Sequence, residues 1–460
     1  MGRGRKLGTA GIVIATAVIG SGAGLAQVTD SNSSPVVKLN LTTSLTADTN
    51  KDLDPVSLGT TVTAAEIVSL SILSETRNQV LSFSAEGALQ VADEPGGGTS
   101  SGFADPSVRL AYARDAANSS VSLSANYRDT DVNRSTIDDD LIPEDLIVDP
   151  GTLKTYGADA QFRYGIDAPL GVTISASTNI RDYSNTIDPD LVDSTRDRFG
   201  VSASLRFSPV TSATLSTDLD RLDEDGPDNL QRDKTSYSVS LSHELRRALT
   251  VTGELGYSQT ETTEFGTRTD EDSVFGSLDL RQALPDGAIF GGVSFENRSA
   301  DPNRVSLKFG REMELRNGAL AGSLTLTQTD GSDLKLLGAL DYNRELPRGA
   351  LTLVLSQSIT SNSDNNDVEI SKLAVGYLHN INSLSRFNLA MDVSRTNEAG
   401  NGNVDKRTRA NFTASYSRDL TADWDLNLGY KRREYRETGS GDANSDSVFL
   451  TLSRGISLGF

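Results

Sequence analysis

The stretch TYGADAQFRYG, residues 155–165, alternates apolar and polar side chains without a break. Successive side chains of a β-strand point to opposite faces. One face of this stretch therefore collects Tyr156, Ala158, Ala160, Phe162 and Tyr164. The other face collects Asp159, Gln161 and Arg163. RFGVSASLRFS (198–208) and WDLNLGYK (424–431) repeat the pattern, which predicts strands with one apolar and one polar face.

Short and long connections alternate between these strands. LPDGA (284–288), LRNGA (315–319) and LPRGA (346–350) begin 31 residues apart, twice running. Each places Gly where a tight hairpin turn requires positive φ, and together they form an internal repeat. Longer polar loops are predicted at 46–60, 92–106, 128–153, 181–197, 220–234 and 258–272.

The order of these elements predicts the architecture. Counting from residue 36 to the end gives about 22 strands, each about nine to eleven residues long, joined by eleven long and ten short connections. An antiparallel meander of this kind predicts an all-β fold, a transmembrane antiparallel up-and-down β-barrel. Only helices and closed barrels satisfy their backbone hydrogen bonds inside a bilayer. A soluble β-sandwich or β-solenoid is the alternative, but a solenoid has shorter repeats and a sandwich does not separate its connections so regularly.

The N-terminus has the features of an export signal. Arg3, Arg5 and Lys6 precede a stretch of apolar and small residues, and Gly24-Leu25-Ala26 supplies a small-x-small cleavage pattern. We expect residues 1–26 to be a cleaved signal peptide, 27–35 a short periplasmic segment and 36–460 the barrel; an N-terminal membrane anchor is the alternative. The sequence contains no cysteine, which excludes a disulfide framework.

The C-terminus, SRGISLGF (453–460), resembles the signal by which the outer-membrane assembly machinery recognises barrel proteins. The matching positions are Ser453, Gly455, Leu458 and Phe460. The whole mature chain resembles proteobacterial outer-membrane β-barrels, including β-barrel porins, some of which accompany polysaccharide export. The resemblance implies an outer-membrane location. It also implies contact with outer-membrane lipid, lipopolysaccharide, the barrel assembly machinery and hydrophilic solutes, and no nucleic-acid partner is expected.

The chain offers no catalytic motif in a usable context, so we expect no enzyme. Alternation instead predicts a polar wall that faces the lumen. Its members are Asp159, Arg163, Arg206, Asp218, Glu254, Asp279, Lys335, Asp341, Arg409, Asp425 and Lys431. A mixed wall of mildly acidic character favours neutral or cationic solutes over anions. Mutual pairing that braces a wet interior is the other interpretation of these charges.

The loop predicted at 128–153 is strongly acidic. Asp129, Asp131, Asn133 and Asp140 occupy positions 1, 3, 5 and 12 of a pattern that resembles a calcium loop. Arg134 stands where that pattern needs Gly, and Asp140 replaces the bidentate Glu. We expect solvated loops without a resident cofactor, with weak divalent cation binding as the alternative.

These observations predict a porin-like outer-membrane channel for hydrophilic solutes, including saccharides or an exported polysaccharide. The alternative is a structural or adhesive barrel that has a closed lumen and surface-binding acidic loops. Barrels of this size usually hold a plug, and the sequence leaves open whether inward loops supply it, a partner supplies it, or the pore is wide.

Overall fold

The computed structural model describes residues 35–96, 98–134, 146–299, 302–361, 367–398, 406–439 and 441–459. Within these residues it consists of 22 strands and a single turn of 3-10 helix, η1 (Val132–Arg134). The first eleven strands are β1 (Val36–Asp48), β2 (Thr61–Thr76), β3 (Gln79–Glu94), β4 (Gly98–Ala116), β5 (Ser119–Asp131), β6 (Thr152–Tyr164), β7 (Leu170–Ser184), β8 (Ser194–Ser208), β9 (Thr211–Glu224), β10 (Gln231–Arg246) and β11 (Leu249–Glu264). The others are β12 (Thr267–Leu284), β13 (Gly287–Arg298), β14 (Arg304–Leu315), β15 (Gly318–Thr329), β16 (Lys335–Leu346), β17 (Gly349–Ser361), β18 (Asp367–Asn382), β19 (Ser385–Glu398), β20 (Arg407–Asp419), β21 (Trp424–Glu437) and β22 (Gly441–Gly459).

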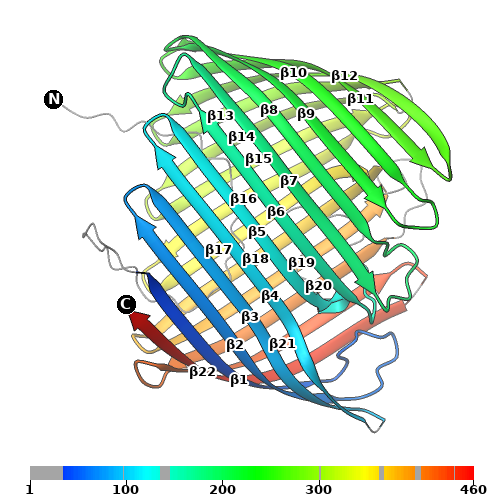
Figure 1. The fold of residues 1–460 in the computed structure, drawn as a ribbon, viewed down its shortest axis with the longest axis vertical. Helices are drawn as coiled ribbons and strands as arrows, with labels where there is room; N and C mark the ends of the chain where they lie inside the picture. The colour runs from blue at the N-terminus through cyan, green and yellow to red at the C-terminus, as the bar shows by residue number, and fades with distance from the viewer. Residues whose placement is uncertain are drawn as a thin grey trace.

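Each strand pairs with its neighbours in sequence, and all the pairings are antiparallel (Figure 1). The ring closes because β1 pairs with β22, from Val36 opposite Gly459 to Asp48 opposite Ser447. No helix in the described part of the chain is long and apolar enough to cross a bilayer. The predicted closed, up-and-down barrel of 22 strands is therefore confirmed.

The strands are longer than alternation alone predicted. They contain 12 to 19 residues, and the loops predicted at 92–106 and 258–272 are strand over nearly their whole length. β3 continues to Glu94 and β4 begins at Gly98, while β11 continues to Glu264 and β12 begins at Thr267. Both regions are polar on both faces, so the period-two signal disappears although the hydrogen-bonded ladder continues.

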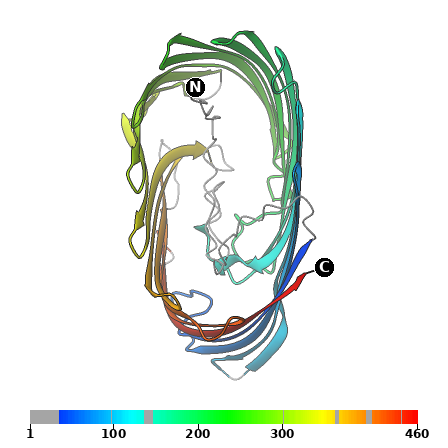
Figure 2. The same ribbon diagram turned by 90° about the vertical axis from the view of Figure 1, so that its left-hand side faces the viewer.

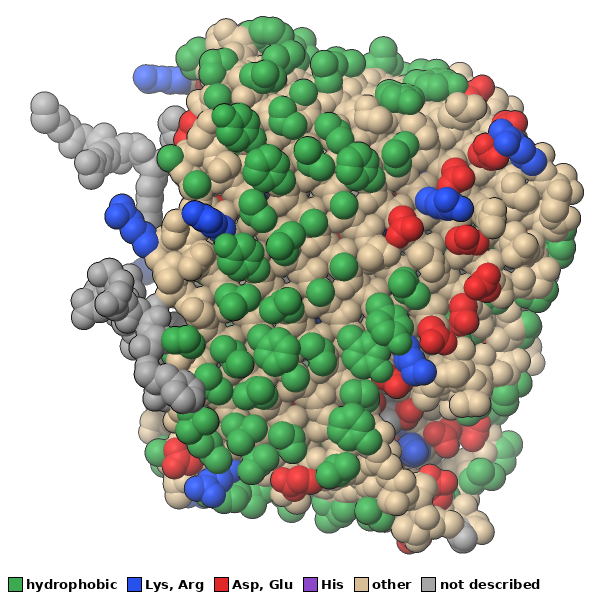
Figure 3. All heavy atoms as spheres, in the orientation of Figure 1, with side chains coloured by type: hydrophobic (Ala, Val, Ile, Leu, Met, Phe, Trp, Pro, Cys, Tyr) green, Lys and Arg blue, Asp and Glu red, His purple; other side chains and the backbone are tan. Residues whose placement is uncertain are grey.

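Apolar side chains cover the outside of the barrel. Leu123, Phe162 and Leu215 are 47%, 41% and 47% exposed, whereas a soluble core would bury such residues. Figure 3 shows hydrophobic side chains over the middle and the short-turn end of the strands, with most of the acidic side chains toward the long-loop end and basic side chains at both ends. This surface matches the lipid-facing band of a membrane barrel, beyond which the strands extend into water.

The internal repeat marks three points where neighbouring strands approach closely. Gly287, Gly318 and Gly349 each begin the strand after a two-residue turn, with φ of 140°, 156° and 157°. A Cβ atom at these positions would lie 2.1, 2.0 and 1.8 Å from a backbone carbonyl oxygen of the next strand. The repeat therefore preserves a backbone contact that only glycine permits.

Replacement of Gly318 by Ala should destabilise the barrel. We expect Gly318→Ala to lower the free energy of unfolding by about 1–3 kcal/mol, because it combines an unfavourable φ with a backbone clash. Gly322→Ala, in the same strand, is the matched control because its Cβ would make only ordinary contacts of 3.5 and 3.7 Å. Urea unfolding of the refolded barrels measures the difference, and equal midpoints would contradict this role of the repeat.

Candidate functional site

The inner wall consists of the strand residues that alternate with the exposed apolar side chains. All eleven residues of the predicted polar wall occupy such positions, on β6, β8, β9, β11, β12, β16, β20 and β21. They are distributed around the ring and do not converge on one point. Their part in solute passage stays a prediction.

Several of these wall residues have local partners. Asp159 accepts a hydrogen bond from Ser124 Oγ at 3.0 Å, and Asp279 accepts one from Ser277 Oγ at 3.1 Å. Lys335 Nζ lies 3.8 Å from Glu369 Oε2. Part of the wall is thus braced by internal contacts, in agreement with the second interpretation of its charges.

Three long connections contribute buried apolar side chains to the interior of the barrel. They join β1 to β2 (49–60), β5 to β6 (132–151, described at 132–134 and 146–151) and β7 to β8 (185–193). Figure 2 shows an elongated ring, with η1 and the β1–β2 connection inside it. Leu53 is 2% exposed, Leu146 0% and Ile147 1%, so these loops form a small core where a hollow barrel would hold water.

The second of these connections crosses the interior. Leu146, Ile147 and Val148 are consecutive in sequence but pack into three separate apolar clusters. The partners are Val368 and Ile370 of β18 for Leu146; Val132, Leu153 and Leu191 for Ile147; and Leu53, Tyr435 and Ala443 for Val148. Because β18 is far from β5 and β6 around the ring, this segment bridges opposite parts of the wall.

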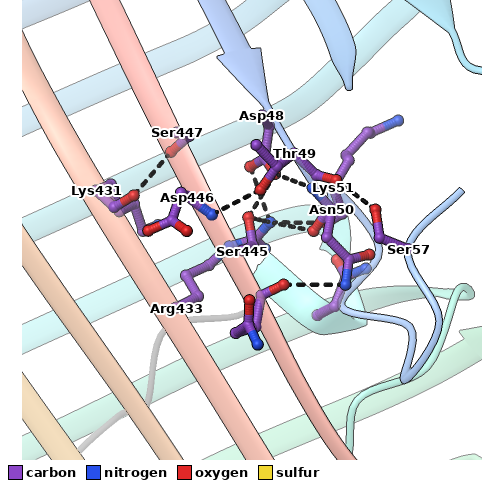
Figure 4. Close-up of polar contacts among 12 residues, drawn as sticks. Asp48, Thr49, Asn50, Lys51, Ser57, Lys431, Arg433, Ser445, Asp446 and Ser447 are labelled. Atoms are coloured by element: carbon purple, nitrogen blue, oxygen red, sulfur yellow. Dashed lines mark hydrogen bonds and ion pairs between the residues drawn. The ribbon is translucent and has the colours of Figure 1, made fainter. Parts of the chain in front are cut away.

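Arg407, Arg409 and Arg433, which we call the arginine clasp, hold the three connections. Arg433 Nη2 donates to Asp48 Oδ2 at 3.0 Å and to the carbonyl oxygens of Asn50 and Lys51 at 3.2 and 2.8 Å (Figure 4). These bonds fix the start of the β1–β2 connection against β21.

The other two arginines lie on the neighbouring strand, β20. Arg409 Nη2 donates to the carbonyl oxygen of Asn133 at 2.5 Å. Arg407 Nη2 donates to Asp190 Oδ2 at 3.2 Å, and its Nε donates to Glu437 Oε1 at 2.6 Å. Two adjacent strands, β20 and β21, thus anchor all three inward connections through charged hydrogen bonds.

Asp149 joins two of the connections to each other. Its Oδ1 accepts from the Gly151 amide at 2.8 Å, and its Oδ2 accepts from the amides of Ile187 and Asp188 at 2.8 and 2.9 Å. Burial raises the pKa of the Asp188 carboxyl above its ordinary value, while the Asp190 amide and the charge of Arg407 oppose the rise. Hydrogen bonds thus join the β5–β6 and β7–β8 connections, and Val148 packs against the cluster that holds Leu53 of the β1–β2 connection. We call these three connections the loop layer.

Sequence reasoning placed Arg409 on the wall but missed the other members of this layer. Arg407, Arg433 and Asp149 carry no local signal, because their partners lie far away in sequence or on another connection. The apolar triplet Leu146-Ile147-Val148 was the available clue, since three consecutive aliphatic residues are out of place in a solvated acidic loop.

The fold places the residues of the calcium-like pattern in different elements. Asp129 and Asp131 belong to β5 rather than to a loop, and they pair across the ladder with Lys154 and Thr152. Asn133 is buried in η1, and Asp140 lies outside the described residues. No group of three or more potential metal-ligating His, Cys, Asp or Glu side chains occurs among the residues that the structure describes.

The C-terminal pattern lies in the closing seam. Ser453 Oγ accepts from Thr42 Oγ1 at 2.9 Å, Gly455 lies opposite Asn40, and Leu458 lies opposite Val37. Phe460 lies outside the described residues, as do the predicted signal peptide and most of segment 27–35. Recognition by the assembly machinery stays a prediction.

Comparisons with known proteins agree with this geometry. The family described as Gram-negative porin matches residues 38–263, just under half of the chain. A search of curated proteins finds no match.

Solved structures share the fold at low sequence identity. The FrpB iron transporter from Neisseria meningitidis has a TM-score of 0.60 and 10% identity, over 92% of this chain and 83% of that one. A mutant of the ferric enterobactin receptor PfeA from Pseudomonas aeruginosa has a TM-score of 0.54 and 10% identity, over 93% of this chain and 82% of the receptor chain. The siderophore receptor PirA from Acinetobacter baumannii has a TM-score of 0.52 and 9% identity, over 93% of this chain and 81% of the receptor chain. These likenesses concern the barrel architecture.

Proposed function

We propose, from the premise that this chain is an outer-membrane β-barrel protein of Gram-negative bacteria, that it is a diffusive channel for small hydrophilic solutes. The observation that carries the proposal is the asymmetric filling of the lumen. The inward loops are anchored to β20 and β21, whereas wall residues on the far side, such as Asp159 and Asp218, remain exposed. A water-filled path along β3–β9 is consistent with this arrangement.

The loop layer favours small solutes over a polymer. The segment Leu146–Val148 crosses the interior, and it is tied to β18, β21 and β22 by apolar packing. A polysaccharide chain would require displacement of this layer, whereas a monosaccharide could pass beside it. We therefore propose passage of small saccharides and other neutral or cationic solutes, and we favour this over polysaccharide export.

Osmotic swelling of proteoliposomes tests the proposal. Vesicles that contain the purified protein should swell in a monosaccharide, and swelling should slow steeply for a trisaccharide and stop for a long dextran. Vesicles without protein are the control. An equal rate for monosaccharide and dextran would favour the polymer pathway, and no swelling in any sugar would favour the closed, surface-binding barrel.

A further inference from the structure

The inner wall of β3–β9 contains a hollow that the loop layer does not use. Its volume is about 610 Å³, and residues of all seven strands line it. It lies on the part of the wall that the proposed channel leaves accessible, so a solute in the lumen can reach it.

The hollow is built from two adjacent rows of directly paired inner-wall residues. One row runs through Ser82, Ala111, Ser124, Asp159, Ser177, Arg198 and Asp220. The other runs through Val80, Ala113, Ser122, Gln161, Ser175, Gly200 and Asp218. Small side chains make up most of both rows, and this makes the wall concave between the larger polar side chains.

The three carboxylates of the hollow differ in whether a neighbouring cation neutralises their charge. Asp220 is paired with Arg196 at 2.5 Å and with Arg198 at 3.5 Å. Asp159 has the neutral Ser124 hydroxyl as its partner at 3.0 Å. Asp218 has no hydrogen-bond or ion-pair partner among the described residues. Two carboxylates of the hollow, Asp159 and Asp218, therefore lack a cation.

We propose that this hollow is a binding site for an extended organic cation that carries at least two amino groups. Asp159 lies on β6 and Asp218 on β9, three strand spacings apart and in adjacent rows. The three spacings amount to about 14 Å across the strands, and the offset of one row adds about 7 Å along them, so the two positions lie about 16 Å apart. An elongated ligand can place one ammonium group at each carboxylate. Where the ligand carries further amino groups between its ends, the serine hydroxyls and Gln161 between the carboxylates accept hydrogen bonds from them.

The composition of the hollow argues against other ligands. Two uncompensated carboxylates disfavour an anion, and the two rows present no aromatic side chain on which a sugar ring could stack. A short diamine can reach only one carboxylate at a time. The proposal rests on the channel function insofar as the ligand arrives through the lumen.

Block of the single-channel current by spermine tests the site. Spermine should reduce the current of the wild-type channel, and putrescine should do so more weakly because it cannot span both carboxylates. Asp159→Asn combined with Asp218→Asn should weaken the spermine block by about tenfold or more, since local charge sets the local cation concentration. The matched control is Glu254→Gln with Asp279→Asn, which removes two wall charges on β11 and β12, outside the hollow.

The possible results distinguish failure of the proposed binding site from failure of the proposed channel function. Equal loss of block in the two double variants, or no block of a conducting wild type, would overturn the proposal. If the wild type does not conduct, the proposed function fails, and calorimetric titration of spermine into the detergent-solubilised barrel still decides the site. Heat absorbed or released by the wild type and lost in Asp159→Asn with Asp218→Asn supports the site; no binding overturns it.

Discussion

Simultaneous replacement of Arg407, Arg409 and Arg433 by Met should widen the channel and raise its single-channel conductance about two- to threefold, because the inward loops then leave the lumen. Each substitution leaves a buried carbonyl or carboxylate without its donor. Removal of one partner from a buried ion pair costs about 3–5 kcal/mol. The side chains of Arg433 and Asp48 are 5% and 14% exposed, so their contact is a buried ion pair of this kind.

The control for the clasp is a triple replacement of exposed arginines at the long-loop end. Arg221, Arg268 and Arg436 are 60%, 58% and 65% exposed and form ion pairs of the kind that contributes little. Their replacement by Met should leave conductance near the wild-type value. Gel mobility without boiling shows whether each variant retains its barrel. A clasp variant that folds and conducts like the wild type would show that these arginines do not hold the loops in place.

The second large effect concerns assembly. Leu458→Asp should abolish most of the outer-membrane accumulation of the protein, with degradation in the periplasm. Leu458 is 46% exposed on the apolar face and pairs with Val37 in the closing seam. A charge on the lipid-facing side costs little near the interface, so we expect the larger loss in recognition of the C-terminal signal.

The neighbouring position supplies the control for this variant. Ser457 lies opposite Lys38 on the inner wall, where an introduced carboxylate faces a cation and water. Ser457→Asp should therefore accumulate normally, and deletion of Phe460 should reproduce the defect of Leu458→Asp. Quantitative immunoblots of outer-membrane fractions measure all three variants. Normal levels of Leu458→Asp would mean that SRGISLGF serves only as the end of a strand.

The architecture could be predicted because its signal is local and repeated. Period-two alternation, as in residues 155–165, identifies a strand without knowledge of its partner, and the alternation of long and short connections orders the strands. The strand ends could not be predicted in the same way. Beyond the membrane both faces are polar, so β11 and β12 continue through residues that have no apolar face.

The loop layer could not be predicted because its contacts span most of the chain. Arg409 and Asn133 are 276 positions apart, and Arg433 and Asn50 are 383 apart. No sequence periodicity relates such residues. The prediction placed Arg409 in the polar wall of the lumen, with mutual pairing of the wall charges as the alternative, whereas in the structure Arg409 donates a hydrogen bond to the carbonyl oxygen of Asn133. Burial of Leu146 against Val368 likewise depends on the closed ring.

The conductance of the purified wild-type protein in a planar bilayer tests the central claim most directly. We predict discrete current steps with a preference for K⁺ over Cl⁻ at 0.01 M salt. That preference should weaken as the screening length falls from about 30 Å at 0.01 M to about 10 Å at 0.1 M. A barrel that keeps its folded gel mobility but shows no conductance at any salt concentration would contradict the claim and identify a closed, surface-binding barrel.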